Sequence, residues 1–353
     1  MEDVSGDVSA AAPPQTLAFE FRGSGREFFR IWFVNIALTL MTLGIYGAWA
    51  KVRTTRYFYG NTYIAGHAFD YHASPWRILI GRIIALLLLL AYSISTQIYP
   101  FAILVWYLIF AAFIPWLINS SLRFTARNSS YRNIRFNFTG AYLEAFIAYV
   151  LWAMVAGATL GLLYPRARKA RDYFYINHHT YGGRSFETEF STGRIYLIYL
   201  AGLGILFGGF IAVSMAVGAL ATAKVIPKDI VGPVIPVAMG LVFFAIYTLM
   251  SVFIDVLVFN LSLNGTMLDK KHKLRSRVSP WRMAWIKITN SLLTLFTIGI
   301  FYPWARIRAA RYQTTRLSLI AASDLDEFTA EVTESQSAIG EEVAGFFDLG
   351  IGL

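Results

Sequence analysis

The sequence predicts a mainly α, polytopic membrane protein with internal repeats, and three observations support this fold class. Of the 353 residues, 56% are hydrophobic and only 15% are charged, whereas a soluble domain carries roughly 25% charged residues. Seven apolar segments follow one another along the chain, and one motif recurs where several of them end. We therefore expect two transmembrane hairpins plus three re-entrant or bent apolar segments, with a juxtamembrane β-portion made of repeated hairpins.

The recurring motif reads T-I-G-I-F-Y-P-W-A-R-I-R-A-A-R-Y from Thr297 to Tyr312. A second copy, T-L-G-I-Y-G-A-W-A-K-V-R-T-T-R-Y, spans Thr42 to Tyr57, and a looser third copy spans Thr159 to Arg171. Each copy ends an apolar run at a glycine and enters a basic, helix-compatible stretch, as a membrane helix does where it reaches lipid headgroups. Three copies in one chain indicate a repeated architecture.

Short alternating runs follow most of the basic stretches and predict β-hairpins. We expect these hairpins at Asn61 to Tyr71, Asn128 to Phe138, Asn177 to Phe190 and from Asn264 onward. The run Leu17 to Arg22 resembles the second strand of such a hairpin, and Thr314 to Ile320 resembles the first. We therefore expect the strands to meet in a shared structure that satisfies their edge hydrogen bonds.

Two pairs of long apolar runs predict the transmembrane hairpins. Each run approaches the twenty residues that are needed to cross the hydrocarbon. The first pair is Trp76 to Ile98 with Phe101 to Asn119, and the second is Arg194 to Thr222 with Val231 to Asn260.

Three further apolar segments end in the T-x-G motif, namely Phe28 to Ala50, Ala141 to Leu163 and Trp281 to Trp304. Seven plain crossings would place the basic loops at Arg123 to Arg135 and Arg166 to Arg184 on opposite sides, against the positive-inside rule. If the three segments return to the side they entered, every basic loop is cytoplasmic. Seven plain crossings remain the alternative.

The charge distribution divides the chain into three parts. Eleven of the 21 acidic residues lie in the two ends, so the part between them holds ten acids and all 31 basic residues. We expect 1–16 and the acidic 321–353 to be disordered, and 17–320 to form one repeated transmembrane domain with cytoplasmic hairpins. The basic excess indicates anionic membrane phospholipids as partners, whereas nucleic acid is disfavoured because no binding motif accompanies it. The oligomeric state is left open.

Three motifs resemble one family. They are F-x-F-x-G-x-G-x-x-F (Phe19 to Phe28), L-G-I-Y-x-x-W-A-K-x-R (Leu43 to Arg53) and Y-P-W-A-R-I-R-x-x-R-Y (Tyr302 to Tyr312). Together they resemble the YjgN family of bacterial inner-membrane proteins, over about Leu17 to Leu319. The resemblance implies a multi-pass protein of the inner membrane, but the family is a domain of unknown function and supplies no catalytic residues. The looser motif copy departs from the family pattern because it has Arg166 in place of the motif tryptophan.

Three polar residues within apolar segments are candidate binding residues. Asn35 and Asn290 occupy equivalent positions before the motif glycine, where the middle copy has Trp152. They either coordinate a solute or form an inter-helix hydrogen bond, and we favour the hydrogen bond. Asp255 is the one acid deep in an apolar run, so it is either a proton or cation site or the partner of a nearby arginine.

The basic residues of the two closer motif copies are the other candidates. They either form an anion-binding ring fed from the cytoplasm or set topology and contact phospholipid, and we favour the second reading. Arg82 and Lys287 are expected to snorkel to headgroups. The six candidates are Lys51, Arg53, Arg56, Arg306, Arg308 and Arg311.

The sequence lacks the motifs that would indicate catalysis, a metal site or a cofactor. Without cysteine there is no disulfide or thiolate site, and the five histidines show no ligand spacing, so no metal or other cofactor is expected. No hydrolase or nucleotide-binding motif is present, so an enzyme is not expected. The best prediction is a transporter or channel-like module for a small anionic solute or lipid. The alternative is a non-transporting scaffold or lipid-binding protein that recruits a cytoplasmic partner.

Overall fold

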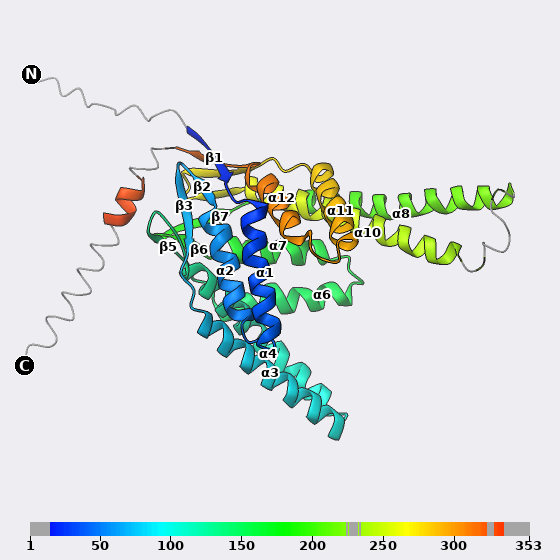
Figure 1. The fold of residues 1–353 in the computed structure, drawn as a ribbon, viewed down its shortest axis with the longest axis horizontal. Coiled ribbons are helices and arrows are strands. Elements are labelled where there is room, and N and C mark those ends of the chain that lie inside the picture. Colours follow the sequence, from blue (N-terminus) through cyan, green and yellow to red (C-terminus); the bar gives the residue numbers. More distant parts are fainter. Residues whose placement is uncertain (1–14, 224, 226–231, 233, 323–327, 335–353) are drawn as a thin grey trace, which may run out of the picture.

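A closed antiparallel β-barrel of ten strands is the centre of the fold (Figure 1). The computed structural model describes residues 15–223, 225, 232, 234–322 and 328–334. The strands are β1 (Gln15–Phe21), β2 (Thr62–Ile64), β3 (His67–Tyr71), β4 (Ser129–Tyr131), β5 (Ile134–Phe138), β6 (His179–Tyr181), β7 (Arg184–Thr188), β8 (Thr266–Leu268), β9 (His272–Ser276) and β10 (Leu317–Ala321).

Four pairs of neighbouring strands, β2–β3, β4–β5, β6–β7 and β8–β9, are hairpins that are closed by tight turns. Ala65 and Gly66 join β2 to β3 with positive φ at both residues, which is the backbone of the hairpin turn that matches strand twist. β1 pairs with β10, with Leu17 opposite Leu319, and with β2 on its other side. This pairing confirms that the first and last strands meet, and it leaves the barrel without an open edge.

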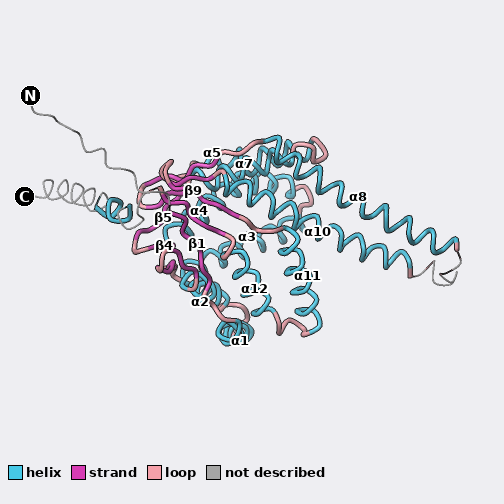
Figure 2. The backbone as a smooth tube through the Cα atoms, turned by 90° about the horizontal axis from the view of Figure 1, so that it is seen from above, coloured by secondary structure: helices cyan, strands magenta, loops and turns pink. Residues whose placement is uncertain are grey.

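The helices extend from one end of this barrel, as both views show (Figures 1 and 2). They are α1 (Gly25–Met41), α2 (Gly47–Gly60), α3 (Pro75–Ile98), α4 (Ala102–Arg127), α5 (Tyr142–Phe146), the π-helix η1 (Ile147–Leu151), α6 (Trp152–Ala158), α7 (Tyr164–Asn177), α8 (Thr192–Thr222), α10 (Ile235–Asn264), α11 (Pro280–Phe296) and α12 (Tyr302–Thr314). Among the described residues, α3, α4, α8 and α10 are the four helices that are long and apolar enough to cross a membrane.

The predicted fold class is therefore wrong. It placed seven apolar segments at the centre and treated the hairpins as a juxtamembrane addition. Instead, a closed ten-stranded barrel organises the chain, and the four membrane-length helices extend from it. Closure requires all ten strands to pair in one register, a property of the whole chain that local alternation does not report.

The other three apolar segments are broken by one backbone feature, which we call an elbow. The first elbow joins α1 to α2, the middle elbow joins α6 to α7, and the last elbow joins α11 to α12. In each, a non-glycine residue with φ near 50° precedes a glycine with φ near 90°, as at Leu43 (49°) and Gly44 (94°). Glycine is needed there because side chains strain this conformation.

A threonine caps each elbow. Thr42 Oγ1 donates to the Leu38 carbonyl at 2.7 Å and accepts from the Tyr46 amide at 2.9 Å. Thr159 and Thr297 make the corresponding pairs of bonds in the middle and last elbows. The chain therefore turns in the same way at all three copies of the motif.

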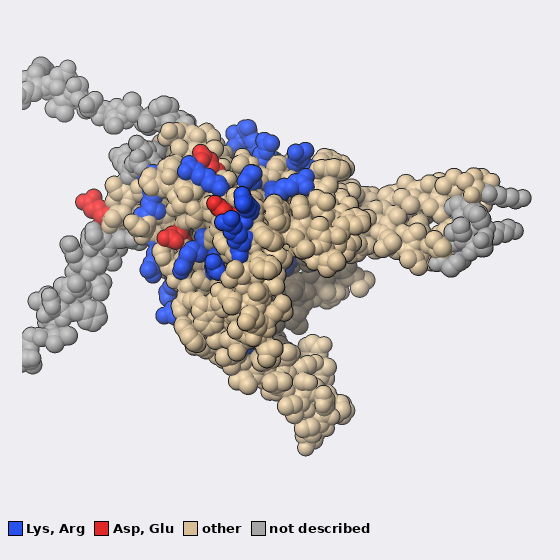
Figure 3. Space-filling model, in the orientation of Figure 1, with Lys and Arg blue, Asp and Glu red and all other residues tan. Residues whose placement is uncertain are grey.

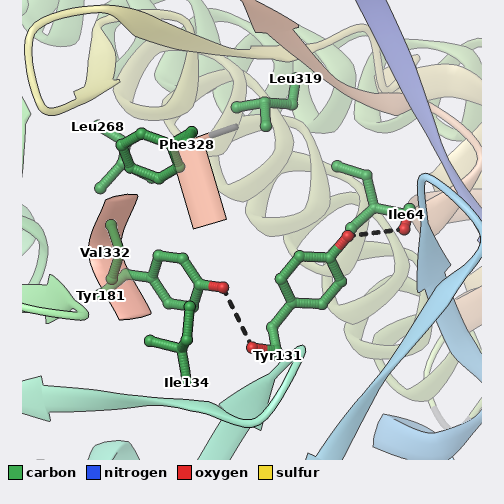
Figure 4. Packing of buried hydrophobic residues seen from close by; sticks show 8 residues of the cluster. All are labelled: Ile64, Tyr131, Ile134, Tyr181, Leu268, Leu319, Phe328 and Val332. Carbon is green, nitrogen blue, oxygen red and sulfur yellow. Dashed lines mark hydrogen bonds between the residues drawn. The ribbon is translucent and has the colours of Figure 1, made fainter. Parts of the chain in front are cut away.

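The barrel interior is an apolar core, and residues 328–334 close its outer mouth (Figure 4). Phe328 and Val332 of this short helical segment are 3% and 0% exposed. Arg184 Nη2 pairs with Glu331 Oε1 at 2.7 Å and holds the segment in place. The predicted disorder of 1–16 and 321–353 lies mostly outside the described residues; within them, Gln15 begins β1 and 328–334 are helical.

Candidate functional site

The last elbow is linked to α1 because α12, the helix that follows this elbow, packs on α1 (Figure 2). The rings of Phe29 and Trp304 are 5.0 Å apart. A Cβ added at Gly25 would lie 2.4 Å from Trp304 Cδ1, so the start of α1 needs glycine for this close approach. Residues from opposite ends of the domain therefore line one groove.

This groove, between α1, α2 and α12, has a volume of about 450 Å³. Two exposed cations line it, Lys51 of α2 and Arg306 of α12. Arg306 lies 5.2 Å from the Phe58 ring centre and donates to the Tyr302 hydroxyl at 3.1 Å. Among the residues that the structure describes, no carboxylate lies within ion-pair distance of either cation. Two uncompensated positive charges therefore face the same space.

A third cation reaches the rim of the groove. A Cβ added at Gly47, which lines the groove, would lie 2.6 Å from Arg82 Nη1 of α3. The sequence predicts only that Arg82 reaches membrane headgroups, and it does not indicate the place beside Gly47. The available signal was an arginine within an otherwise apolar run, which is rare unless the side chain has a local purpose.

Asn35 also lines the groove and is 5% exposed. Its Nδ2 donates to the Ala50 carbonyl at 3.5 Å and to Thr54 Oγ1 at 3.4 Å, so it ties α1 to α2 with two long bonds. Its Oδ1 is buried and has no hydrogen-bond partner within the described part of the chain. A buried acceptor of this kind costs about 1–3 kcal/mol unless something donates to it.

Asn290 occupies the equivalent place in the last elbow, but both ends of its amide are paired. Nδ2 donates to the Ala305 carbonyl at 2.9 Å, and Oδ1 accepts from Arg308 Nη1 at 3.2 Å. Arg308 Nη1 also donates to Thr289 Oγ1 at 2.8 Å. Asn290 lines a different open groove, of about 690 Å³, which has no basic lining residue. The two asparagines are thus not joined in one site.

The remaining motif cations do not complete a ring. Arg56 Nε donates to the Tyr71 carbonyl at 3.2 Å, and Arg311 Nη2 donates to the Gly23 carbonyl at 2.8 Å. The first bond holds α2 against the end of β3, and the second holds α12 against the residues that follow β1. Arg53 is exposed and has no bonded partner among the described residues. Of the six predicted basic residues, the structure brings Lys51 and Arg306 together at the groove.

Asp255 lies elsewhere, on an exposed position of α10. Its Oδ1 pairs with Arg168 Nη1 at 3.3 Å, and Arg168 Nε also pairs with Asp172 at 3.2 Å. Burial raises the pKa of Asp172 above the ordinary aspartate value, and Arg168 offsets part of that rise. Asp255 is thus the partner of an arginine that links α7 to α10, the second of the two roles considered for it.

The middle elbow differs in its side chains. Trp152 stands at the asparagine position, and the guanidinium of Arg166, which stands at the tryptophan position, lies 5.3 Å from its ring centre. In this elbow, the contact between Arg166 and Trp152 takes the place of the asparagine-to-carbonyl hydrogen bond of the other two elbows. The groove beside this elbow, about 340 Å³, is lined mostly by alanine and glycine.

The fold and the groove define the class of this protein. It is a polytopic membrane protein in which four membrane-length helices extend from a closed β-barrel, with a cationic groove between α1, α2 and α12. The chain belongs to the family described as "Bacterial protein of unknown function (DUF898)", whose match covers residues 16–346.

The named relatives of this chain are all described as inner-membrane proteins. The chain is 28% identical over 145 residues to "Inner membrane protein YjgN" of Escherichia coli O157:H7, an alignment that covers 40% of this chain and 36% of that protein. It is 22% identical over 340 residues to the protein of that name from Salmonella typhimurium, covering 81% of this chain and 84% of the relative. The Escherichia coli alignments thus span about a third of those proteins. No solved structure matches the chain.

Proposed function

We propose that this protein is an inner-membrane lipid-binding protein that holds the phosphate of an anionic phospholipid in the groove between α1, α2 and α12. The observation that carries the proposal is the placement of Lys51 and Arg306, both without a carboxylate partner in the described chain, beside the unpaired Oδ1 of Asn35. A phosphate satisfies the two cations through charge-assisted hydrogen bonds.

The surroundings of the groove suit a lipid better than a freely diffusing anion. Trp32, Phe28 and Ile36 of α1 line the same space as the two cations. A phospholipid presents its phosphate next to apolar chains, so one molecule meets both surfaces. Arg82, on the membrane-length α3, reaches the rim and supplies a further positive charge at the depth of the headgroups.

The proposed orientation places the barrel on the cytoplasmic side of the membrane. Lys and Arg side chains gather over the barrel and the adjoining helices, whereas the coloured outer halves of the two helical hairpins show none in this view (Figure 3). Because all ten strands close into one barrel, every hairpin turn lies on the same side of the membrane. Reporters fused at Arg127 and Arg184 should both report the cytoplasm, and a periplasmic signal from either contradicts this orientation.

A path for a small anionic solute is the weaker proposal. It would require Asn35, Asn290 and Asp255 to share a polar cavity. Asn35 and Asn290 line separate grooves, and Asp255 is engaged with Arg168 on another helix pair. The proposal is accordingly one of binding, without catalysis.

Native mass spectrometry of the detergent-purified protein tests the proposal, with phosphatidylglycerol and phosphatidylcholine as probes. Phosphatidylglycerol should bind more tightly. The double substitution Lys51→Ala/Arg306→Ala should weaken phosphatidylglycerol about 30-fold, at about 1 kcal/mol for each basic residue. It should weaken phosphatidylcholine less, because the choline cation offsets the charge of its phosphate.

The matched control is Lys273→Ala/Arg275→Ala, which removes two exposed cations from β9 without touching the groove. It should retain the wild-type preference. The proposal is overturned if the control loses as much affinity as the groove variant, or if the wild type does not prefer the anionic lipid.

A further inference from the structure

A second cavity, of about 280 Å³, lies where the barrel meets the helices. The barrel contributes Phe69, Phe136, Phe186 and Leu274 to its lining. The remaining walls come from the last turns of α2, α4, α7 and α10 and from the first residues of the strands that follow. This cavity shares no lining residue with the groove at the elbows.

The barrel wall of the cavity belongs to a ring of phenylalanines, of which Phe69, Phe136 and Phe186 line the cavity and Phe19 lies beside Phe69. Phe19, Phe69, Phe136 and Phe186 come from β1, β3, β5 and β7, and successive ring centres are 6.3, 6.4 and 6.5 Å apart with the planes nearly parallel. Leu274 of β9 is packed against the same core. On the far side of this ring, the buried residues of Figure 4, with residues 328–334, fill the barrel. Access to the cavity is therefore from the side of the helices.

The lining of the cavity carries no acidic, lysine or arginine side chain. His179 is the one lining group that could take a charge near neutral pH; its Nδ1 donates to the Tyr175 carbonyl, and burial lowers its pKa, which favours the neutral ring. The hydroxyl ends of Tyr59 and Tyr175 supply limited polarity. An uncharged, mainly apolar space of this size favours an apolar ligand over ordered water.

Two of the four helices that end at the cavity, α4 and α10, are membrane-length. Hydrocarbon chains are the apolar molecules available along such helices. A volume of 280 Å³ is close to the lower end of the range for small-molecule pockets, so it suits one chain better than a two-chain lipid.

We propose that the cavity beneath the phenylalanine ring binds a single acyl chain, donated either by a membrane phospholipid or by a free fatty acid. The chain enters between the helix ends and stops against Phe136 and its neighbours in the ring. Because the cavity is uncharged and separate from Lys51 and Arg306, this site does not depend on the headgroup site.

Photo-crosslinking of the full-length protein tests the proposal. Two probes carry a diazirine at the end of the acyl chain, a phosphatidylglycerol and a free fatty acid. Peptide mapping should place the crosslinks on cavity residues such as Phe136 and Tyr175. Labelling by the phospholipid alone identifies a bilayer lipid as the source, and labelling by the fatty acid alone identifies a single-chain ligand; crosslinks that fall elsewhere with both probes overturn the proposal.

The substitution Leu274→Phe adds a phenylalanine to the three barrel phenylalanines that already line the cavity. It should lower crosslinking at cavity residues by about tenfold or more, since overfilling a packed space is costly. Leu17→Phe, on β1 outside the cavity, is the matched control and should crosslink as the wild type does. Lys51→Ala/Arg306→Ala should also leave this labelling unchanged, so the failure of one site is distinguished from the failure of the other.

Discussion

The first and last elbows share a motif and a backbone break, yet only the last one satisfies its buried asparagine. Asn35 and Asn290 both donate to a carbonyl fifteen residues further along the chain. Arg308 donates to the acceptor of Asn290, whereas Arg53, at the corresponding place in α2, is exposed and Asn35 Oδ1 has no partner in the described chain. The same motif thus closes one elbow and leaves the other incomplete.

The difference teaches that the motif determines the turn, while the neighbouring helix determines the chemistry. Both elbows share a hydrogen bond in which a tyrosine hydroxyl accepts from a serine amide. The distance is 2.8 Å for Tyr57 and 2.9 Å for Tyr312. What sets the first elbow apart is that α12 brings Arg306 to it. The groove therefore forms beside the first elbow because α12 packs there, although the motif itself is common to both elbows.

The largest expected difference between the elbows concerns their asparagines. Asn290→Ala should lower the free energy of unfolding by about 2–3 kcal/mol, because it leaves the Ala305 carbonyl and the Arg308 guanidinium with lost partners in a buried site. Asn35→Ala should cost about 1 kcal/mol or less, because its bonds are long and its acceptor is already unpaired. Denaturant unfolding in detergent without added phospholipid measures both, and an equal or larger loss for Asn35→Ala contradicts the comparison.

The glycine of the break should behave alike in both elbows. Gly44 and Gly299 have φ of 94° and 88°, and a Cβ at either would meet no atom within 4 Å. The cost of alanine is therefore conformational and should be about 1–2 kcal/mol at each position. Gly81→Ala, in the middle of α3 with equally open surroundings, is the control and should not destabilise the protein. A large difference between the first two variants would show that the breaks are not equivalent.

The local elements were predictable because their signals are local. Alternation and two-residue turns indicated the hairpins, and the motif glycines indicated the three breaks, since a left-handed residue is a property of a few neighbouring positions. The unpaired run Leu17 to Arg22 indicated a partner elsewhere, which is Leu317–Ala321 of β10. These features need no knowledge of how distant segments pack.

Barrel closure and the groove could not be obtained in the same way. Closure depends on ten pairings at once, and the groove depends on α12 packing on α1 through Trp304 and Gly25. From the motif alone, Lys51 and Arg306 could not be distinguished from Arg56 and Arg311 as candidate binding residues. Only the packing shows that the last two are occupied by backbone carbonyls while the first two face open space.

The smallest expected effects come from the tyrosines that the two elbows share. Tyr57→Phe and Tyr312→Phe should each cost about 1 kcal/mol, because each removes the acceptor for a serine amide. Burial raises the pKa of Tyr57 above its ordinary value of 10.0, so the folded protein favours the protonated phenol. The advantage of the wild type over Tyr57→Phe should therefore be constant below pH 10 and should decline as the pH rises through the raised pKa. Unfolding of both proteins from pH 8 to pH 11 measures this, and an advantage that grows with pH would show that the Tyr57 hydroxyl is not held in its protonated form by the elbow.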